Sequence, residues 1–186
     1  LAQAGQGSAE SQESVFAGGW RVIEQRADGS VRDSIEVGPI PSVLLQAALE
    51  DGRSGPPPAS AVPPGVMNAP AIVSELEDQR RVWRPGRAPH TVNLTLLPLS
   101  PDDIAYLDHR LGTGRVLILS RGYGNCRITD TCVPHTWRVV YYNSQDAVIL
   151  NSVEVSELPD VARAAPEDLQ DSAERLAEVL AWVQQG

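Results

Sequence analysis

Polar and apolar side chains alternate over residues 91–97, which predicts a half-buried β-strand. Its apolar face consists of Val92, Leu94 and Leu96. The spacing then changes to that of an amphipathic helix, with apolar positions at Ile104, Leu107 and Leu111. Ser100 and Pro101 are typical of a helix start, and Gly112 is typical of a helix end. We therefore expect a strand followed by a helix.

Four further strand candidates follow, and short turns join them. They cover residues 115–120, 126–131, 137–143 and 147–155. Strands connected in this way form an antiparallel meander. A last helix begins at Pro166, and we expect its apolar stripe to be buried: Leu169, Ala173, Leu176, Leu180 and Val183. This order of elements predicts an α+β fold, an antiparallel β-meander with helices packed on one face.

The segments 19–43 and 136–161 resemble each other. Each contains Trp-Arg-Val, a strand-like run, a polar turn, a second strand, and Glu-Val followed by a proline. Trp20 matches Trp137, and Glu36 matches Glu154. We interpret this as a duplicated unit whose first copy is incomplete. Either the first copy has lost elements, or the sequence skips residues, or the sequence begins inside a longer protein.

The composition divides the chain into three parts. Residues 51–67 are rich in proline and glycine and predict an extended, semi-rigid linker. Residues 1–50 then form the partial first repeat, and residues 68–186 form the complete second repeat. In both repeats we expect a tryptophan to anchor the core, and we expect Trp182 to pack the last helix. Glu36 and Glu154 are placed to accept hydrogen bonds from free backbone N–H groups.

The charge balance excludes several classes of function. The 186 residues carry a formal net charge of -9, which disfavours nucleic-acid binding. No apolar run is long enough to span a bilayer, and no basic segment precedes a hydrophobic core at the N-terminus. Two cysteines without CxxC spacing do not indicate a disulfide framework. We therefore expect a soluble protein of the reducing cytoplasm.

The stretch SRGYGNCRIT, residues 120–129, contains an unusual group of candidate residues: Gly122, Tyr123, Gly124, Asn125, Cys126 and Arg127. A phosphate-binding loop would require a strand-to-helix junction, whereas this stretch joins two predicted strands. A hairpin turn in which Gly or Asn has a positive φ is the stronger interpretation. Cys126 and Cys132 would lie roughly 20 Å apart on an unbroken strand, unless a bend reverses the chain.

No catalytic or metal-binding pattern is present. The three histidines show no spacing typical of a triad, and we expect no cofactor and no self-contained metal site. Eight acids and two arginines lie between Glu154 and Glu178. One interpretation is a solvated helix face, whose first acids, Glu167 and Asp168, are stabilised by the helix dipole. The alternative is an acidic docking surface for a basic partner, formed by Glu167, Asp168, Asp171 and Glu174.

Three stretches carry a family resemblance: NLTLLPLSPDDIAYLDHRLGTGRVLILSRGYGNCRIT, TWRVVYYNSQDAVILNSVEV and AAPEDLQDSAERLAEVL. With these motifs the chain resembles the HupH/HyaF family (HoxQ-like) of hydrogenase expression/formation proteins. The resemblance covers residues 68–183 and extends to the upstream repeat. The front part of the first unit is missing, which leaves open the partner contacts of that region.

The resemblance implies an accessory chaperone of the cytoplasm and not an enzyme. Its partner would be the small, iron-sulfur subunit precursor of a [NiFe]-hydrogenase before assembly and export, and a thioredoxin-like accessory chaperone is a further associated protein. The contact surfaces we expect are the hairpin 122–127 and the acidic helix. The alternative is a redox or iron-sulfur-handling factor that uses Cys126. An open sheet edge leaves a homodimer as another possibility.

Overall fold

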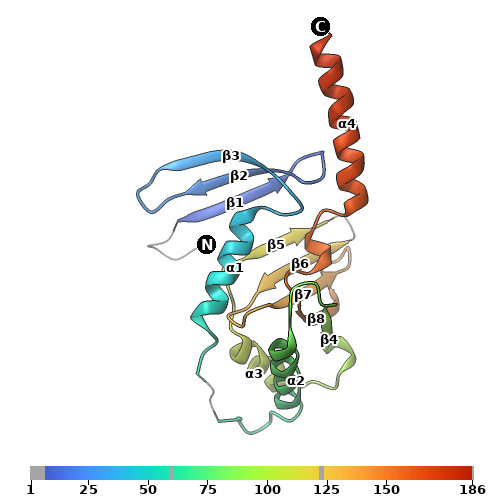
Figure 1. Cartoon of the computed structure of the whole chain (residues 1–186). Coiled ribbons are helices and arrows are strands. Elements are labelled where there is room, and N and C mark those ends of the chain that lie inside the picture. Colours follow the sequence, from blue (N-terminus) through green and yellow to red (C-terminus); the bar gives the residue numbers. More distant parts are fainter. Residues whose placement is uncertain (1–6, 59–60, 122–123, 186) are drawn as a thin grey trace. The chain divides into compact units, whose positions relative to one another are not determined.

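The computed structural model describes residues 7–58, 61–121 and 124–185. These residues form two compact units (Figure 1). Unit 1 consists of the described residues of 1–45 and 163–186, and unit 2 consists of those of 46–162. Both contain antiparallel sheet and helix, so the predicted α+β class is confirmed. The domain boundaries expected from composition stay a prediction.

Unit 2 contains a five-stranded sheet in which every neighbouring pair is antiparallel. The strands are β4 (His90–Asn93), β5 (Leu117–Ser120), β6 (Asn125–Asp130), β7 (Thr136–Tyr142) and β8 (Val148–Val155). Their order is β4-β8-β7-β6-β5, so β5 to β8 form the predicted meander and β4 pairs with the last strand. A register shift lies between Tyr141 and Tyr142.

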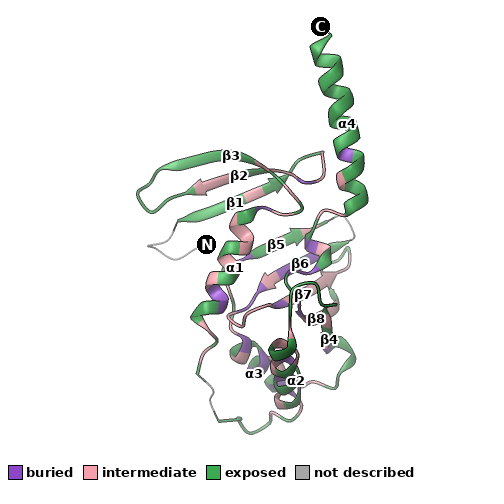
Figure 2. Ribbon diagram, in the orientation of Figure 1, coloured by how far each residue is buried: buried purple, intermediate pink, exposed green. Residues whose placement is uncertain are grey.

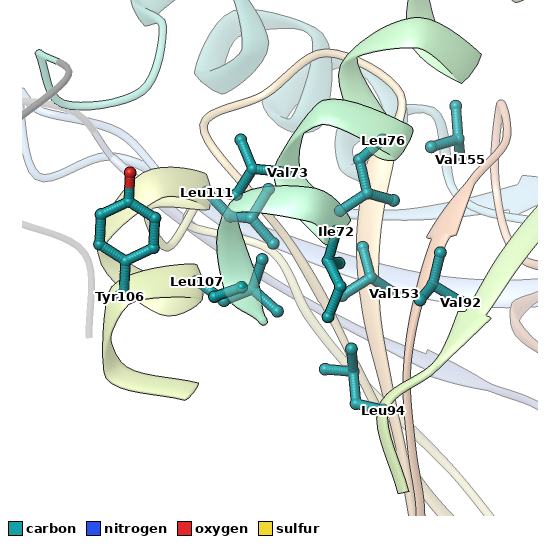
Figure 3. Packing of buried hydrophobic residues seen from close by; sticks show 11 residues of the cluster. Ile72, Val73, Leu76, Val92, Leu94, Tyr106, Leu107, Leu111, Val153 and Val155 are labelled. Carbon is teal, nitrogen blue, oxygen red and sulfur yellow. The ribbon is translucent and has the colours of Figure 1, made fainter. Parts of the chain in front are cut away.

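Helices α2 (Ala69–Val82) and α3 (Pro101–Leu111) pack on this sheet. Their apolar side chains meet those of β4 and β8 in one cluster, which Figure 3 shows. Its labelled members are Ile72, Val73, Leu76, Val92, Leu94, Tyr106, Leu107, Leu111, Val153 and Val155. Burial of this apolar surface is the main stabilising contribution to unit 2.

The strand predicted over residues 91–97 is shorter than expected. The 3₁₀ helix η1 (Leu94–Leu96) replaces its second half, because the Asn93 side chain accepts a hydrogen bond from the Thr95 N–H and turns the backbone. Val92 and Leu94 are buried as predicted, but Leu96 is exposed. A local side-chain hydrogen bond thus overrides the alternating pattern.

Helix α3 begins and ends where the sequence predicts. Ser100 and Asp103 form a capping box, and Gly112 ends the helix with φ +66°. Asp103 is also fully buried, and its Oδ1 accepts the backbone N–H groups of Met67, Asn68 and Ala69 at 2.8–2.9 Å. One carboxylate therefore caps the start of α2 as well as that of α3.

Unit 1 contains a three-stranded antiparallel sheet of β1 (Ser8–Glu13), β2 (Gly19–Gln25) and β3 (Val31–Val37), in that order. Helix α4 (Pro166–Gln184) belongs to this unit: the Ser172 hydroxyl accepts the Ala17 N–H at 2.8 Å, and the Arg175 guanidinium lies over the Phe16 ring. Glu36 accepts the Ser42 N–H at 2.8 Å, as its sequence position predicted.

Helix α1 (Ser42–Ser54) begins in unit 1 and continues into unit 2. Its last residues, Asp51 to Ser54, belong to the segment whose composition predicted a linker. Asp51 and Gly52 are buried, and Gly52 lies so close to Pro134 that a Cβ atom would stand 3.0 Å from its Cα. Packing in unit 2 thus keeps this end of the segment helical.

The predicted burial of the α4 stripe is wrong. Ser172 is the buried residue of this helix, and the side chains expected in the core are mostly exposed. Leu176, Leu180 and Val183 are 45%, 57% and 60% exposed, and Trp182 is 76% exposed. Figure 2 shows most of α4 in the colour of exposed residues. The helical period was recognised correctly, but among the described residues unit 1 contacts only the start of the stripe, where the half-buried Leu169 lies beside Gly18.

Among the described residues, no helix combines the length and the apolar character that crossing a membrane requires.

Candidate functional site

The SRGYGNCRIT stretch forms a β-hairpin. β5 pairs with β6 in antiparallel register, with Ser120 opposite Cys126. Gly124 has φ +104°, a conformation that favours glycine, so the predicted positive-φ turn is confirmed at this residue. Gly122 and Tyr123, which we also expected in the contact surface, lie outside the described residues.

A surface hollow of about 380 Å³ lies beside this hairpin. Its lining is formed by Leu119, Ser120, Arg121, Asn125, Cys126, Arg127, Tyr142 and Asp146. The Arg127 guanidinium lies 5.8 Å from the centre of the Tyr142 ring, a cation–π distance. Arg127 lies beside an aromatic ring, and Arg121 lines the same hollow. Such a polar, open surface is more typical of a protein contact than of a small-molecule site, which is a closed and mostly apolar pocket.

Cys126 is a buried thiol. It is 3% exposed, and burial raises the pKa of its side chain. Since the thiolate is the reactive form, this environment does not favour redox or metal chemistry at neutral pH. The chain does reverse after Asp130, where β6 ends and a turn leads into β7, yet both cysteines are free thiols.

The histidines take part in separate contacts. The His135 ring stacks on Trp83 with 3.6 Å between ring centres, and His90 Nε2 lies 2.7 Å from a Glu75 carboxylate oxygen. Burial lowers the pKa of His135. In the part of the chain that the structure describes, no three His, Cys, Asp or Glu side chains are grouped to hold a metal ion.

An ionic cluster in unit 2 was not predicted from the sequence. The Asp51 carboxylate accepts two hydrogen bonds from Arg115, each 2.6 Å long, one from the backbone N–H and one from Nε. The Arg115 Nη2 atom also donates to Glu50 at 2.9 Å. Burial would raise the pKa of Asp51, but the hydrogen bonds from Arg115 outweigh it and keep this pKa below its ordinary value.

Asp130 lies beside Asp51 and is 3% exposed. Its Oδ1 accepts the Val116 N–H at 2.9 Å. Burial, together with the neighbouring Asp51 carboxylate, raises the pKa of Asp130 to about 7. Asp130 is therefore the member of the pair that holds a proton in mildly acidic solution.

Two neighbouring positions show how closely the cluster is packed. A Cβ atom on Gly114 would collide with the Asp130 carboxyl group, and one on Gly112 would lie 2.8 Å from Cys132 Sγ. Burial and the two carboxyls raise the pKa of Cys132. The alternation of Cys126, Ile128 and Asp130 along β6 could have indicated that Asp130 lies on the buried face of the strand. Nothing in the sequence indicated that Asp51 would be the neighbour of Asp130.

The acidic surface of α4 lies in unit 1, whereas the hairpin lies in unit 2. All four of its predicted residues are exposed: Glu167, Asp168, Asp171 and Glu174. Glu174 accepts a hydrogen bond from Gln170, one turn earlier. Beyond this acidic first half, α4 exposes the apolar side chains of Leu176, Val179, Leu180 and Val183. The helix thus exposes both carboxylates and apolar groups.

These features define an α+β protein with one buried thiol, one half-buried thiol and an exposed amphipathic helix, a surface of the kind that suits contacts with other proteins. Residues 66–183 match the family described as HupH hydrogenase expression protein, C-terminal conserved region. The chain belongs to this HupH family, as the sequence motifs predicted.

Several named relatives are similar over most of the chain. The hydrogenase expression/formation protein HoxQ of Cupriavidus necator is 58% identical over 92% of this chain and 61% of its own length. HupH of Rhodobacter capsulatus is 52% identical over 91% of this chain and 59% of its own length. The hydrogenase-1 operon protein HyaF of Escherichia coli is 37% identical over 98% of this chain and 64% of its own length. The chain therefore spans about three fifths of the length of these relatives.

One solved structure is similar as well. It is the hydrogenase expression protein HupH from Thiobacillus denitrificans, 27% identical, with a TM-score of 0.54. The similarity covers 63% of this chain and 96% of that chain. The shared part thus corresponds in size to the family match.

Proposed function

We propose that this protein is a cytoplasmic accessory factor in [NiFe]-hydrogenase maturation that binds the small-subunit precursor before assembly and export and catalyses no reaction itself. The names of the relatives, hydrogenase expression/formation proteins, support the process. A thioredoxin-like accessory protein is a further partner in this proposal.

The observation that carries the proposal is the surface of α4. Its first half exposes four carboxylates, and its second half exposes a stripe of apolar side chains at helical spacing. Carboxylates attract a basic segment and guide its approach, whereas apolar contacts supply affinity. An exported precursor with an arginine-bearing signal peptide offers both kinds of group.

The test is capture of the small-subunit precursor by the purified protein, with and without the signal peptide. We expect the Asp168→Lys/Asp171→Lys/Glu174→Lys variant to lose at least about tenfold in affinity, since three favourable charges become repulsive. The control variant, Glu10→Lys/Asp78→Lys/Asp102→Lys, has the same change in net charge at exposed acids outside α4.

Each outcome has a defined meaning. Loss of capture in the α4 variant but not in the control supports the acidic surface. Equal capture by both variants removes α4 as the contact, and a wild-type protein that captures neither form of the subunit contradicts the proposed function. Capture of both forms of the subunit moves the contact from the signal peptide to the folded subunit.

A further inference from the structure

The three strands of unit 1 have the same pairing as three strands of unit 2. In β2, Trp20 lies opposite Glu13 of β1 and Glu36 of β3. In β7, Trp137 lies opposite Asp130 of β6 and Glu154 of β8. The paired lengths also agree, since β1 and β6 each pair over six residues. The pairing register of β1-β2-β3 therefore matches that of β6-β7-β8 up to the register shift between Tyr141 and Tyr142.

A side-chain contact repeats at equivalent positions. Arg21 Nε donates to Asp33 Oδ1 at 3.1 Å in unit 1, and Arg138 Nε donates to Asn151 Oδ1 at 2.6 Å in unit 2. In both units the arginine lies on the central strand, and its acceptor lies on the strand that follows. The two sheets therefore correspond in their side chains as well as in their backbones.

The equivalent faces differ in what covers them. Ile35 lies opposite Arg21 as Val153 lies opposite Arg138, and Val37 and Val155 are the next residues on the same faces. Val153 and Val155 are 0% and 2% exposed in the core under α2 and α3. Ile35 and Val37 are 80% and 89% exposed, and Figure 2 shows β3 in the colour of exposed residues.

The edges differ in the same way. The outer edge of β8 pairs with β4, where Val92 lies opposite Val153. The equivalent edge of β3 pairs with no strand among the described residues. An open edge next to exposed apolar side chains is a site where another strand adds to a sheet.

We propose that the face and edge of β3 around Ile35 and Val37 bind a strand and two amphipathic helices built like α2, β4 and α3, carried in longer family members by the same polypeptide. The repeat supplies the geometry, since the exposed Ile35 and Val37 of unit 1 have the buried equivalents Val153 and Val155 in unit 2. About two fifths of the Cupriavidus necator relative lies outside the match, which is more chain than the Ala69–Leu111 segment requires.

The charges on the face define the occupant further. In unit 2, Arg138 also pairs with Asp108 of the covering helix α3 at 3.0 Å, because Asn151 carries no charge. In unit 1, Asp33 already supplies a carboxylate to Arg21 at 2.6 Å. The helix that covers Arg21 therefore needs no acid at the position equivalent to Asp108.

Thiol labelling tests this proposal. We expect the Ile35→Cys variant of the 186-residue chain to react with a maleimide like an exposed thiol, and the Val153→Cys variant to react at least about 100-fold more slowly because reaction requires opening of the core. At the position matching Ile35 in full-length HoxQ of Cupriavidus necator, we expect a cysteine to react at least about tenfold more slowly than in this chain. The exposed Asp78→Cys variant and its match in HoxQ are the controls, with equal rates expected in both proteins.

Two results would overturn the proposal. One is equally rapid labelling of the matching cysteine in the full-length relative, which would show that this face stays open. The other is labelling of Ile35→Cys that slows with rising protein concentration together with a dimer in light scattering, which would make a second copy the occupant. The unsubstituted chain measures the background from Cys126 and Cys132.

Discussion

The carboxyl group of Asp130, at the end of β6, lies against the carboxylate of Asp51 in α1, and Asp130 holds a proton in mildly acidic solution. Within the described part of the chain, no N–H or hydroxyl group donates to Asp130 Oδ2. A proton on Asp130 therefore reduces the repulsion between the two acids and lets the Asp130 carboxyl group donate a hydrogen bond to the Asp51 carboxylate.

This pair predicts a pH dependence of stability. The folded-state pKa of Asp130 is about 7, above the ordinary value of an aspartate, so the folded protein binds more protons than the unfolded chain between these two values. The free energy of unfolding is then expected to fall by about 2 kcal/mol as the pH rises from 5 to 7.5. Urea unfolding at several pH values measures this change.

The Asp130→Asn variant is the control for this prediction, because an amide can donate to Asp51 at every pH. We expect it to lose the slope attributed to Asp130. His135 contributes with the opposite sign, since its lowered pKa favours folding as the pH rises, so the comparison uses the difference between the variant and the wild type. A difference that stays constant from pH 5 to 7.5 would contradict the assignment.

Asp103 predicts a large loss of stability on truncation. Its buried carboxylate accepts hydrogen bonds from the N-termini of two helices, and these bonds hold its pKa well below the ordinary value. In Asp103→Ala the donors lose their acceptor, and we expect the melting temperature to fall by about 5–10 °C. Asp102→Ala, a neighbouring exposed acid, should change it by only about 1–2 °C. Similar melting temperatures for both variants would refute this role.

Two leucines test the different burial of α3 and α4. Leu107 is 0% exposed in the core of unit 2, and Leu107→Ala should cost about 2–5 kcal/mol of unfolding free energy. Leu180 is 57% exposed, and Leu180→Ala should cost less than about 0.5 kcal/mol while weakening capture of the hydrogenase precursor. Chemical denaturation and the capture assay measure the two effects. A large stability loss in Leu180→Ala would mean that the stripe is covered in solution.

Cys126 tests the rival redox function. Because the thiol is buried and its pKa is raised, we expect it to react with a disulfide reagent only after local opening, and more slowly than the half-buried Cys132. Anaerobically purified protein should contain neither iron nor sulfide, and Cys126→Ser should still support hydrogenase maturation. Bound iron that disappears in Cys126→Ser would instead favour an iron-sulfur role.

The local sequence was sufficient for many elements. Ser100, Pro101 and Gly112 act within one or two turns of the backbone, so α3 was predicted with its ends. The meander followed from alternation and short turns, and the family followed from contiguous motifs. These signals depend on neighbours in the chain, and a sequence displays them directly.

Only the tertiary structure decided which predicted faces are buried. The α4 stripe has the same helical period as a core helix, but burial depends on whether another element covers it, and the period carries no such information. Asp51 and Asp130 are far apart in sequence, and folding places their carboxyls together. Ile35 and Val153 have equivalent positions in matching strands, yet only Val153 lies beneath helices. Contacts between distant segments determine burial and pKa, and a linear pattern does not specify those contacts.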